Sequence, residues 1–253
     1  MSYNIKYDNV NDTVNNWNDR KMPMVEVLKK RHPEFIGMQE VLYRQLDYLN
    51  SALEDYDYIG VGRDDGKQKG EFSPIFYDTE RFKLLESNTF WLSKTPTLIS
   101  VGWDAAMERI CTYGLFEDKS TGKKMYVFNT HFDHIGTKAR KNAAKLILRQ
   151  IAKRNKQKLP VILMGDFNLR PTEKPILFIK KRMEDGHAIS KNAVQGPKGT
   201  YNGFDRNAPI NRRIDYIFLQ GWTVSQYEHL DARLKNGKHV SDHLPVLATI
   251  AIP

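Results

Sequence analysis

Short hydrophobic runs and helical patterns alternate irregularly along the chain, and together they indicate its fold class. Runs rich in β-branched and aromatic residues predict strands at residues 2–7, 35–39, 56–61, 73–77, 82–91, 110–117, 124–129, 161–165, 214–219 and 244–250. Apolar positions three and four residues apart predict helices at residues 24–31, 41–53, 137–153 and 174–181. This mixed order is typical of an α/β protein in which two packed sheets carry helices on their outer faces.

The composition fits one globular domain over residues 1–253. Hydrophobic residues make up 40% of the chain, enough for a normal buried core, and no Pro/Gly-rich linker or composition shift divides it. No stretch approaches the ~20 apolar residues of a membrane helix, so we expect no membrane span. Cys111 is the only cysteine, which excludes an internal disulfide and a Cys-based zinc site. We expect the protein to act as a monomer.

The chain is basic, with 39 Lys and Arg against 30 Asp and Glu and a formal net charge of +9. This charge attracts phosphate-rich partners, nucleic acid among them. Much of the excess lies in helical runs at residues 138–141 and 153–156, where a solvated helix face is the usual explanation. Charge alone therefore gives only weak support for a polyanionic partner.

The strand pattern at the N-terminus begins at residue 2, with no polar lead-in and no signal-peptide architecture. A first strand rarely starts so early. We therefore expect further residues upstream in the natural protein, an export signal among the options. The compartment, cytoplasmic or exported, stays open.

Acidic and amide side chains follow several predicted strands, where a sheet usually presents a reactive site on its loops. Glu40 ends the second strand, where its carboxylate would suit a hard cation, although an acid opening the next helix is equally expected there. Asp166 and Asn168 lie two apart and point to one face in extended chain. An acid can deprotonate water while an amide holds it, and the apolar strand before them favours this interpretation over an ordinary turn.

Two histidines lie at strand ends. His131 follows Tyr-Val-Phe-Asn-Thr, and His243 follows Asp242 just before Leu-Pro-Val. A lone histidine is more often structural than catalytic. Two of them beside carboxylates shift that balance, because imidazoles can donate hydrogen bonds to the oxygens of a transferring phosphoryl group.

These motifs together resemble the endonuclease/exonuclease/phosphatase superfamily. The resemblance rests on Tyr-Asn-Ile at 3–5, Gln-Glu at 39–40, Asn-Thr-His at 129–131, Gly-Asp-Phe-Asn at 165–168, Arg-Ile-Asp-Tyr at 213–216 and Ser-Asp-His-Leu-Pro at 241–245. Residues 7–20 resemble bacterial members without a settled substrate. The resemblance implies a DNase I-like, four-layer α/β/β/α sandwich and a metal-assisted in-line attack of water on phosphorus.

The resemblance also implies a divalent cation, Mg²⁺ with Mn²⁺ as a substitute. It assigns Glu40 as the main ligand, Asn4 as a neighbour and Asp242 as a further contributor. Mg²⁺ keeps several waters, so one or two protein carboxylates suffice.

The remaining roles concern water and phosphate. By similarity, Asp166 orients or deprotonates the water and Asn168 holds the phosphate. The resemblance further implies two histidine–carboxylate pairs at the phosphate: His243 with Asp215, and His131 with Glu71. Catalysis of this kind is mainly positioning plus charge stabilisation.

Substrate choice depends on loops outside these motifs. Arg109 is a candidate for a second phosphate, and Tyr201, Asn202 and Phe204 lie in a segment, 200–205, whose aromatic rings can stack on a base. Tryptophans in the neighbouring loops are expected to pack beneath them.

We expect a phosphodiesterase or nuclease acting on a nucleic acid or a nucleotide-like ester. The alternative is a phosphomonoesterase for a small phosphorylated metabolite, such as a sugar or inositol phosphate. A non-catalytic binding module is disfavoured, because such a module would be expected to have lost the acids or histidines that this chain retains.

Overall fold

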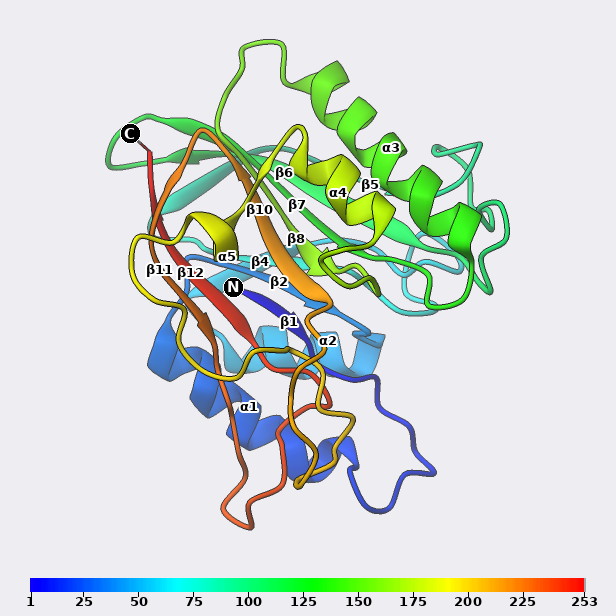
Figure 1. Cartoon of the computed structure of the whole chain (residues 1–253), viewed down its shortest axis with the longest axis vertical. Helices are drawn as coiled ribbons and strands as arrows, with labels where there is room; N and C mark the ends of the chain where they lie inside the picture. Colours follow the sequence, from blue (N-terminus) through cyan, green and yellow to red (C-terminus); the bar gives the residue numbers. More distant parts are fainter. Residues whose placement is uncertain (253) are drawn as a thin grey trace.

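The computed structural model describes residues 1–252 and shows two stacked six-stranded sheets with helices outside them (Figure 1). The first sheet has the order β11-β12-β1-β2-β4-β3. Its strands are β1 (Ser2–Asn4), β2 (Phe35–Gln39), β3 (Tyr56–Ile59), β4 (Ile75–Asp78), β11 (Thr223–His229) and β12 (Val246–Ala251). The last strands of the chain therefore lie beside the first one.

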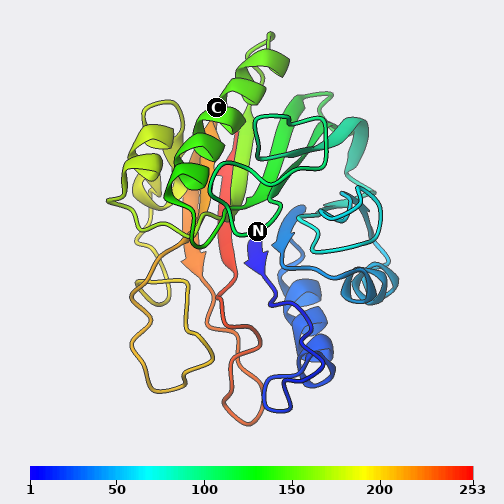
Figure 2. The same cartoon turned by 90° about the vertical axis from the view of Figure 1, so that its right-hand side faces the viewer.

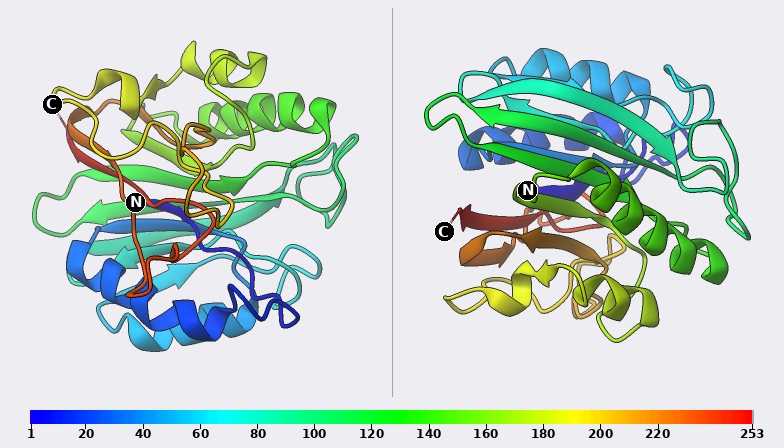
Figure 3. Two further views of the ribbon diagram at one scale, coloured as in Figure 1. Left: turned by 60° about the horizontal axis from the view of Figure 1, so that its bottom comes forward. Right: turned by 90° about the horizontal axis from the view of Figure 1, so that it is seen from above.

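The second sheet has the order β5-β6-β7-β8-β10-β9. Its strands are β5 (Phe82–Trp91), β6 (Ile110–Asp118), β7 (Lys124–His131), β8 (Val161–Asp166), β9 (Glu184–Asp185) and β10 (Asp215–Gln220). The helices are α1 (Trp17–Arg31), α2 (Tyr43–Ala52), α3 (Thr137–Arg154), α4 (Lys174–Lys180) and α5 (Gly186–Ile189). Helices α1 and α2 cover the first sheet, and α3 and α4 cover the second (Figure 3). The four-layer sandwich expected from the sequence is confirmed.

Three hydrophobic layers hold the sandwich together. Phe35 and Met164 belong to the layer between the sheets, whereas Ile36 packs with residues of α1 and Leu163 packs with residues of α3. Neighbouring residues of one strand thus enter different layers, because successive side chains point to opposite faces. Strands covered on both faces read as continuous apolar runs, and this explains the unbroken Val161–Met164 segment.

The structure departs from the sequence expectations at several elements. Strand β1 ends at Asn4 rather than at 7, and the short elements β9 and α5 were not expected. Helix α1 begins at Trp17 rather than at 24, because the Asn16 side chain caps it by accepting a hydrogen bond from Asp19 N. Pro23, which usually marks a helix boundary, lies inside this helix. Strand β11 was not expected, since Thr223–His229 carries polar residues between its apolar ones and pairs with β12 at an edge. Within residues 1–252, no helix is both long and apolar enough for a membrane span.

The sheet topology brings several strand ends to one edge of the sandwich. Strands β1 and β2 run parallel with Asn4 opposite Gln39, and β7 and β8 run parallel with His131 opposite Asp166. Strand β10 begins at the same edge, with Asp215 opposite Asp166. The long loops at 5–16, 200–214 and 230–245 extend together from one end of the molecule (Figure 2).

Candidate active site

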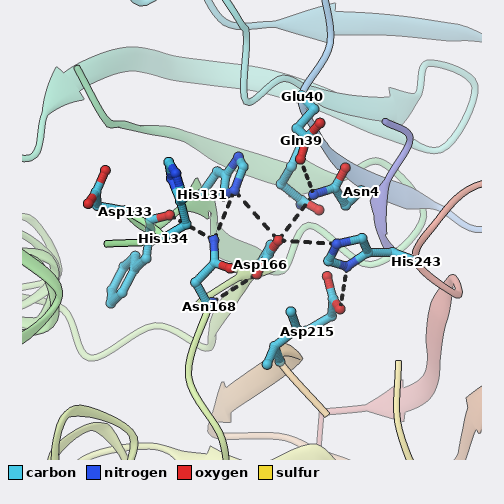
Figure 4. A network of polar contacts seen from close by, with 12 residues as sticks. Asn4, Gln39, Glu40, His131, Asp133, His134, Asp166, Asn168, Asp215 and His243 are labelled. Atoms are coloured by element: carbon cyan, nitrogen blue, oxygen red, sulfur yellow. Dashed lines mark hydrogen bonds and ion pairs between the residues drawn. The ribbon is translucent and has the colours of Figure 1, made fainter. Parts of the chain in front are cut away.

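Asp166 lies at the centre of a polar network that joins both sheets (Figure 4). Its Oδ2 accepts a hydrogen bond from Asn4 Nδ2 at 3.1 Å. The same oxygen lies 3.5 Å from His131 Nε2 and 3.7 Å from His243 Nε2. Residues separated by up to 239 positions in the sequence, from Asn4 to His243, therefore surround one buried carboxylate.

The Gly-Asp-Phe-Asn motif takes its shape from the backbone. Gly165 has φ +151°, and a Cβ there would lie 2.0 Å from the Thr130 carbonyl oxygen of β7, so only glycine fits. Phe167 is fully buried in the core, which sends its two neighbours toward the site. Asn168 adopts φ 50°, a left-handed conformation fixed by its N–H donating to Asp166 Oδ1 at 2.8 Å.

The amide of Asn168 defines the tautomer of His131. Asn168 Nδ2 lies 3.1 Å from both the Phe132 carbonyl oxygen and His131 Nε2. The carbonyl can only accept, so it fixes the amide nitrogen on this side, and His131 Nε2 must then accept the second amide hydrogen. The ring proton of neutral His131 therefore sits on Nδ1, which faces Glu71 Oε2 at 3.8 Å.

The two histidines have opposite electrostatic settings. Burial lowers the pKa of His243, but the carboxylates of Asp215 and Asp166 outweigh burial and raise it to about 10. Its Nδ1 lies 2.8 Å from Asp215 Oδ2, which also accepts from Thr200 Oγ1 at 2.5 Å. Burial holds the pKa of His131 well below its usual range, and the guanidinium groups of Arg109 and Arg63 lower it further. His243 is thus a cation at neutral pH, and His131 is not.

Asp166 has an environment suited to proton exchange near neutrality. Burial, followed by the nearby charge of Asp215, raises the pKa of Asp166 to about 7. A carboxylate with this pKa can take a proton from water and release it again at physiological pH.

A second acidic group lies beside this centre. Glu40 follows β2 with φ 60°, and its carboxylate accepts hydrogen bonds from Asn4 Nδ2 at 3.1 Å and Tyr7 N at 3.2 Å. Lys6 Nζ lies 3.5 Å from Glu40 Oε2 and 3.7 Å from Asp242 Oδ2. Burial, and then the negative charge of Glu40, raise the pKa of Asp242. A positive charge between these carboxylates already stabilises them, so the pair suits a hard cation that prefers oxygen ligands.

Asp166, Asp215 and His243 also place ligand atoms within 4.8 Å of one another, a spacing compatible with a metal. However, His243 Nδ1 already bonds Asp215. The oxygen-only pair of Glu40 and Asp242 is therefore the better match for Mg²⁺ or Mn²⁺.

Glu71 and Arg109 lie in a charged cluster behind His131. Glu71 Oε2 bonds Arg63 Nη1 at 2.8 Å, which is closer than its approach to His131. Arg109 is buried, with Nε 3.3 Å from Asp133 Oδ1 and Nη2 3.0 Å from His134 Nδ1. In this structure Arg109 is held by these neighbours and lies beneath the site surface rather than projecting from it.

The 200–205 segment borders the site at His243. The Tyr201 ring packs edge-on against the His243 ring with centroids 5.0 Å apart, and Asn202 Nδ2 donates to the Ser241 carbonyl at 2.9 Å. Phe204 lies farther out, with the Arg20 guanidinium 5.6 Å from its ring centroid. Tyr201 and Asn202 therefore support the segment before β12 that carries His243, and Phe204 covers Arg20.

Two motif residues join the sheets instead of facing the reaction centre. Asn129 on β7 donates to the carbonyls of Met38 and Pro74, and its side-chain oxygen accepts from Gln39 Nε2 at 2.7 Å. Gly37 makes room for this contact, because a Cβ there would lie 2.8 Å from the Asn129 side chain. We call these hydrogen bonds between Asn129 and its partners in the first sheet the sheet clamp.

Several contributors were not identified from the sequence. Lys6, Thr200 and Arg63 all bond site carboxylates, yet none stands in a motif that marks it. The one signal for them was the position of Lys6, two residues after Asn4 at the end of the first strand.

Two stacked mixed sheets with acid, amide and imidazole groups at one edge define the DNase I-like class of hydrolases. The sequence profile of the endonuclease/exonuclease/phosphatase family matches residues 1–243, and the chain belongs to this family.

Known relatives cover most or all of the chain. An endonuclease/exonuclease/phosphatase of Bacteroides vulgatus is 38% identical with a TM-score of 0.94, over 100% of this chain and 97% of that one. A mannosyl-6-phosphatase of Bacteroides thetaiotaomicron is 37% identical with a TM-score of 0.93, over 99% of this chain and 98% of that one. A probable RNA exonuclease of Saccharomyces cerevisiae is 28% identical over 180 residues, 66% of this chain and 35% of the yeast protein.

Proposed function

We propose that the protein hydrolyses a phosphate monoester of a small phosphorylated metabolite, most specifically a sugar phosphate, with the help of a divalent cation. The observation that carries the hydrolysis is the contact of Asn4, His131 and His243 with one carboxylate, Asp166. The substrate class is supported by the mannosyl-6-phosphatase, which is 37% identical along nearly its whole length.

In this proposal Asp166 accepts the proton of the attacking water, since its pKa of about 7 allows it to be ionised at working pH. The water oxygen bonds to phosphorus as the bond between phosphorus and the sugar oxygen breaks, and that oxygen leaves as the alcohol with a proton from solvent. The Asn168 amide nitrogen is engaged by Phe132 and His131, which leaves its oxygen to accept a hydrogen bond from that water. Asn4 donates to both Asp166 and Glu40, so it fixes the position of the base relative to the acid proposed to bind the metal.

Charge on the phosphoryl oxygens is met by His243. Its pKa of about 10 keeps the ring protonated, and Asp215 holds Nδ1 so that the Nε2 hydrogen points to the substrate side, near Asp166. Neutral His131 acts through Asn168, whose amide it orients.

Glu40 and Asp242 would hold the cation, with Asn4 beside them. When bound, a divalent cation supplies further neutralisation of the phosphate charge and polarises the phosphoryl oxygens. The fit rests on the donor set, two carboxylates that already share a positive group, the Lys6 ammonium.

The position of the basic residues favours a small substrate over a nucleic acid. Helix α3 covers the outer face of the second sheet and has no acidic residue in its first turn. It carries Lys138, Arg140, Lys141, Lys145, Arg149, Lys153 and Arg154. The loops around the site mix both signs, because Asp8, Asp64 and Asp205 stand there close to Lys6, Arg63 and Arg206. The excess charge thus belongs largely to an outer helix face rather than to a groove that leads into the site.

A diesterase or nuclease activity is the second candidate. It is favoured by the match to the probable RNA exonuclease of yeast, although that match spans 35% of the yeast protein.

The experiment is turnover with Mg²⁺ of three substrate sets: sugar and inositol phosphates, oligonucleotides, and a generic phosphodiester. We expect phosphate release from sugar phosphates, abolished by EDTA and by Asp166→Asn. Cleavage of oligonucleotides or the diester without monoester turnover would replace the first proposal by the second. Absence of turnover in every set, or equal activity in Asp166→Asn, would reject the roles proposed for Asp166 and the two histidines.

A further inference from the structure

Lys6 places its ammonium between the two carboxylates that the proposed function assigns to the metal. Nζ lies 3.5 Å from Glu40 Oε2 and 3.7 Å from Asp242 Oδ2. Both carboxylates are largely shielded from water, with side-chain exposures of 13% and 9%. Two such charges repel each other strongly in a medium less polar than water, so the ammonium compensates them.

The backbone of Lys6 is held firmly, which fixes where its side chain begins. Lys6 has φ 59°, and its N–H donates to Asn4 Oδ1 at 3.1 Å. Its carbonyl accepts from Arg20 Nη2 at 3.2 Å and from Gln45 Nε2 at 3.1 Å. Arg20 is itself almost fully buried. The ammonium is thus delivered to the carboxylate pair by an ordered turn.

The side chain also has a route away from the carboxylates. It is 29% exposed, and Nζ lies 4.6 Å from the centroid of the Tyr7 ring, which is itself solvent-facing. An aromatic face attracts an ammonium group. The Tyr7 ring thus already contacts the ammonium together with the carboxylates, and the side chain borders solvent, so a movement of Nζ away from the carboxylates does not require the turn to unfold.

We propose that Lys6 is a built-in competitor of the divalent cation. Its ammonium neutralises Glu40 and Asp242 in the metal-free protein, and it withdraws from them when the metal binds. The metal therefore binds more weakly than the two carboxylates alone would allow, and the metal-free site stays folded. This inference rests on the proposed function, because it takes these carboxylates as the metal ligands.

The test is direct metal binding, measured by titration calorimetry of the full chain with MgCl₂ and independently by Mn²⁺ paramagnetic resonance. Lys6→Gln removes the charge, and we expect its Kd for Mg²⁺ to fall by about tenfold or more, the effect typical of one charge within ~4–6 Å of a carboxylate. Lys6→Arg keeps the charge and should stay near the wild-type Kd. Lys30→Gln, in the last turn of α1 away from Asn4, is the matched control for net charge and should change nothing.

Thermal unfolding supplies a second readout. In EDTA, Lys6→Gln should melt below the wild type, because its two carboxylates face each other uncompensated, and Mg²⁺ should raise its melting temperature more than that of the wild type.

The outcomes separate the two proposals. Measurable Mg²⁺ binding with the same or a higher Kd in Lys6→Gln would overturn the competitor role while leaving the hydrolase intact; a raised KM for substrate alongside it would make Lys6 a substrate contact. No Mg²⁺ or Mn²⁺ binding by any variant would overturn both the competitor role and the metal dependence of the proposed function.

Discussion

Replacing Asn129 by alanine tests whether the sheet clamp holds the sandwich together. The substitution removes hydrogen bonds to the Met38 and Pro74 carbonyls and from Gln39 Nε2, all of them buried. Gln39 Nε2 keeps the Gly37 carbonyl, and Pro74 O keeps the Met38 N–H. At ~1 kcal/mol net for each lost hydrogen bond, we expect the free energy of unfolding to fall by about 3 kcal/mol. That is a large share of the ~5–15 kcal/mol typical of a domain.

The same substitution should lower activity, because Glu40 directly follows Gln39 and His131 lies two residues after Asn129. Small displacements of positioned groups reduce rates strongly, so we expect kcat to fall by roughly ten- to a hundredfold. Urea unfolding and steady-state kinetics measure the two effects. Asn88→Ala is the control, since this exposed side chain on β5 bonds only the next backbone N–H, and its effect should stay within ~0.5 kcal/mol. A loss below about 1 kcal/mol in Asn129→Ala with unchanged kcat would refute the clamp.

Three further predictions concern the base, the backbone and the acid stability. Asp166→Asn should lower kcat by about 10²–10⁴-fold, because it removes the base. It should also raise the melting temperature at pH 8, because it removes a buried carboxylate whose pKa is raised to about 7. Calorimetry that shows a lower melting temperature would contradict the second effect. Gly165→Ala should lower the free energy of unfolding by roughly 3 kcal/mol or more, because its Cβ would meet the Thr130 carbonyl oxygen at 2.0 Å. Gly122→Ala is the control: its Cβ meets open space, so it should lose only about 1–2 kcal/mol, from its positive φ. Equal losses in urea unfolding would disprove the steric cause. Burial lowers the pKa of His229 to about 4, whereas in the unfolded chain the same imidazole binds a proton near pH 6.5. The free energy of unfolding should therefore fall as pH falls from about 6.5 to 4, by about 3 kcal/mol at most. His229→Gln should show a shallower decline across that window, and an identical slope would show that His229 does not contribute.

The fold class was predictable because hydrophobic patterns record which residues are buried. The unbroken apolar run of β8 and the apolar stripe of α3 each indicate an element packed on a sheet, and the structure uses them so. Strand β11 was missed, because an edge strand such as Thr223–His229 alternates with polar residues and needs its partner β12 to be recognised.

The site was only partly predictable, since a motif gives residue types and not directions. Asn129 and His131 stand two apart in one motif, yet the first enters the space between the sheets and the second reaches Asp166. Which of them meets the reaction centre depends on the opposite sheet. Arg109 likewise could not be placed, because its partner Asp133 lies 24 positions away and comes close only after β6 and β7 have paired.

The pairing of β1 with β12 has a consequence for how the enzyme is made. Ser2 lies opposite Val246, and β1 carries Asn4 while the segment just before β12 carries His243. During synthesis β1 can pair early with β2, whereas its other neighbour, β12, leaves the ribosome only after all the strands of the second sheet. A chain that stops before His243 therefore lacks the β12 edge of the first sheet and one of the two imidazoles that contact Asp166, so we expect it to be inactive.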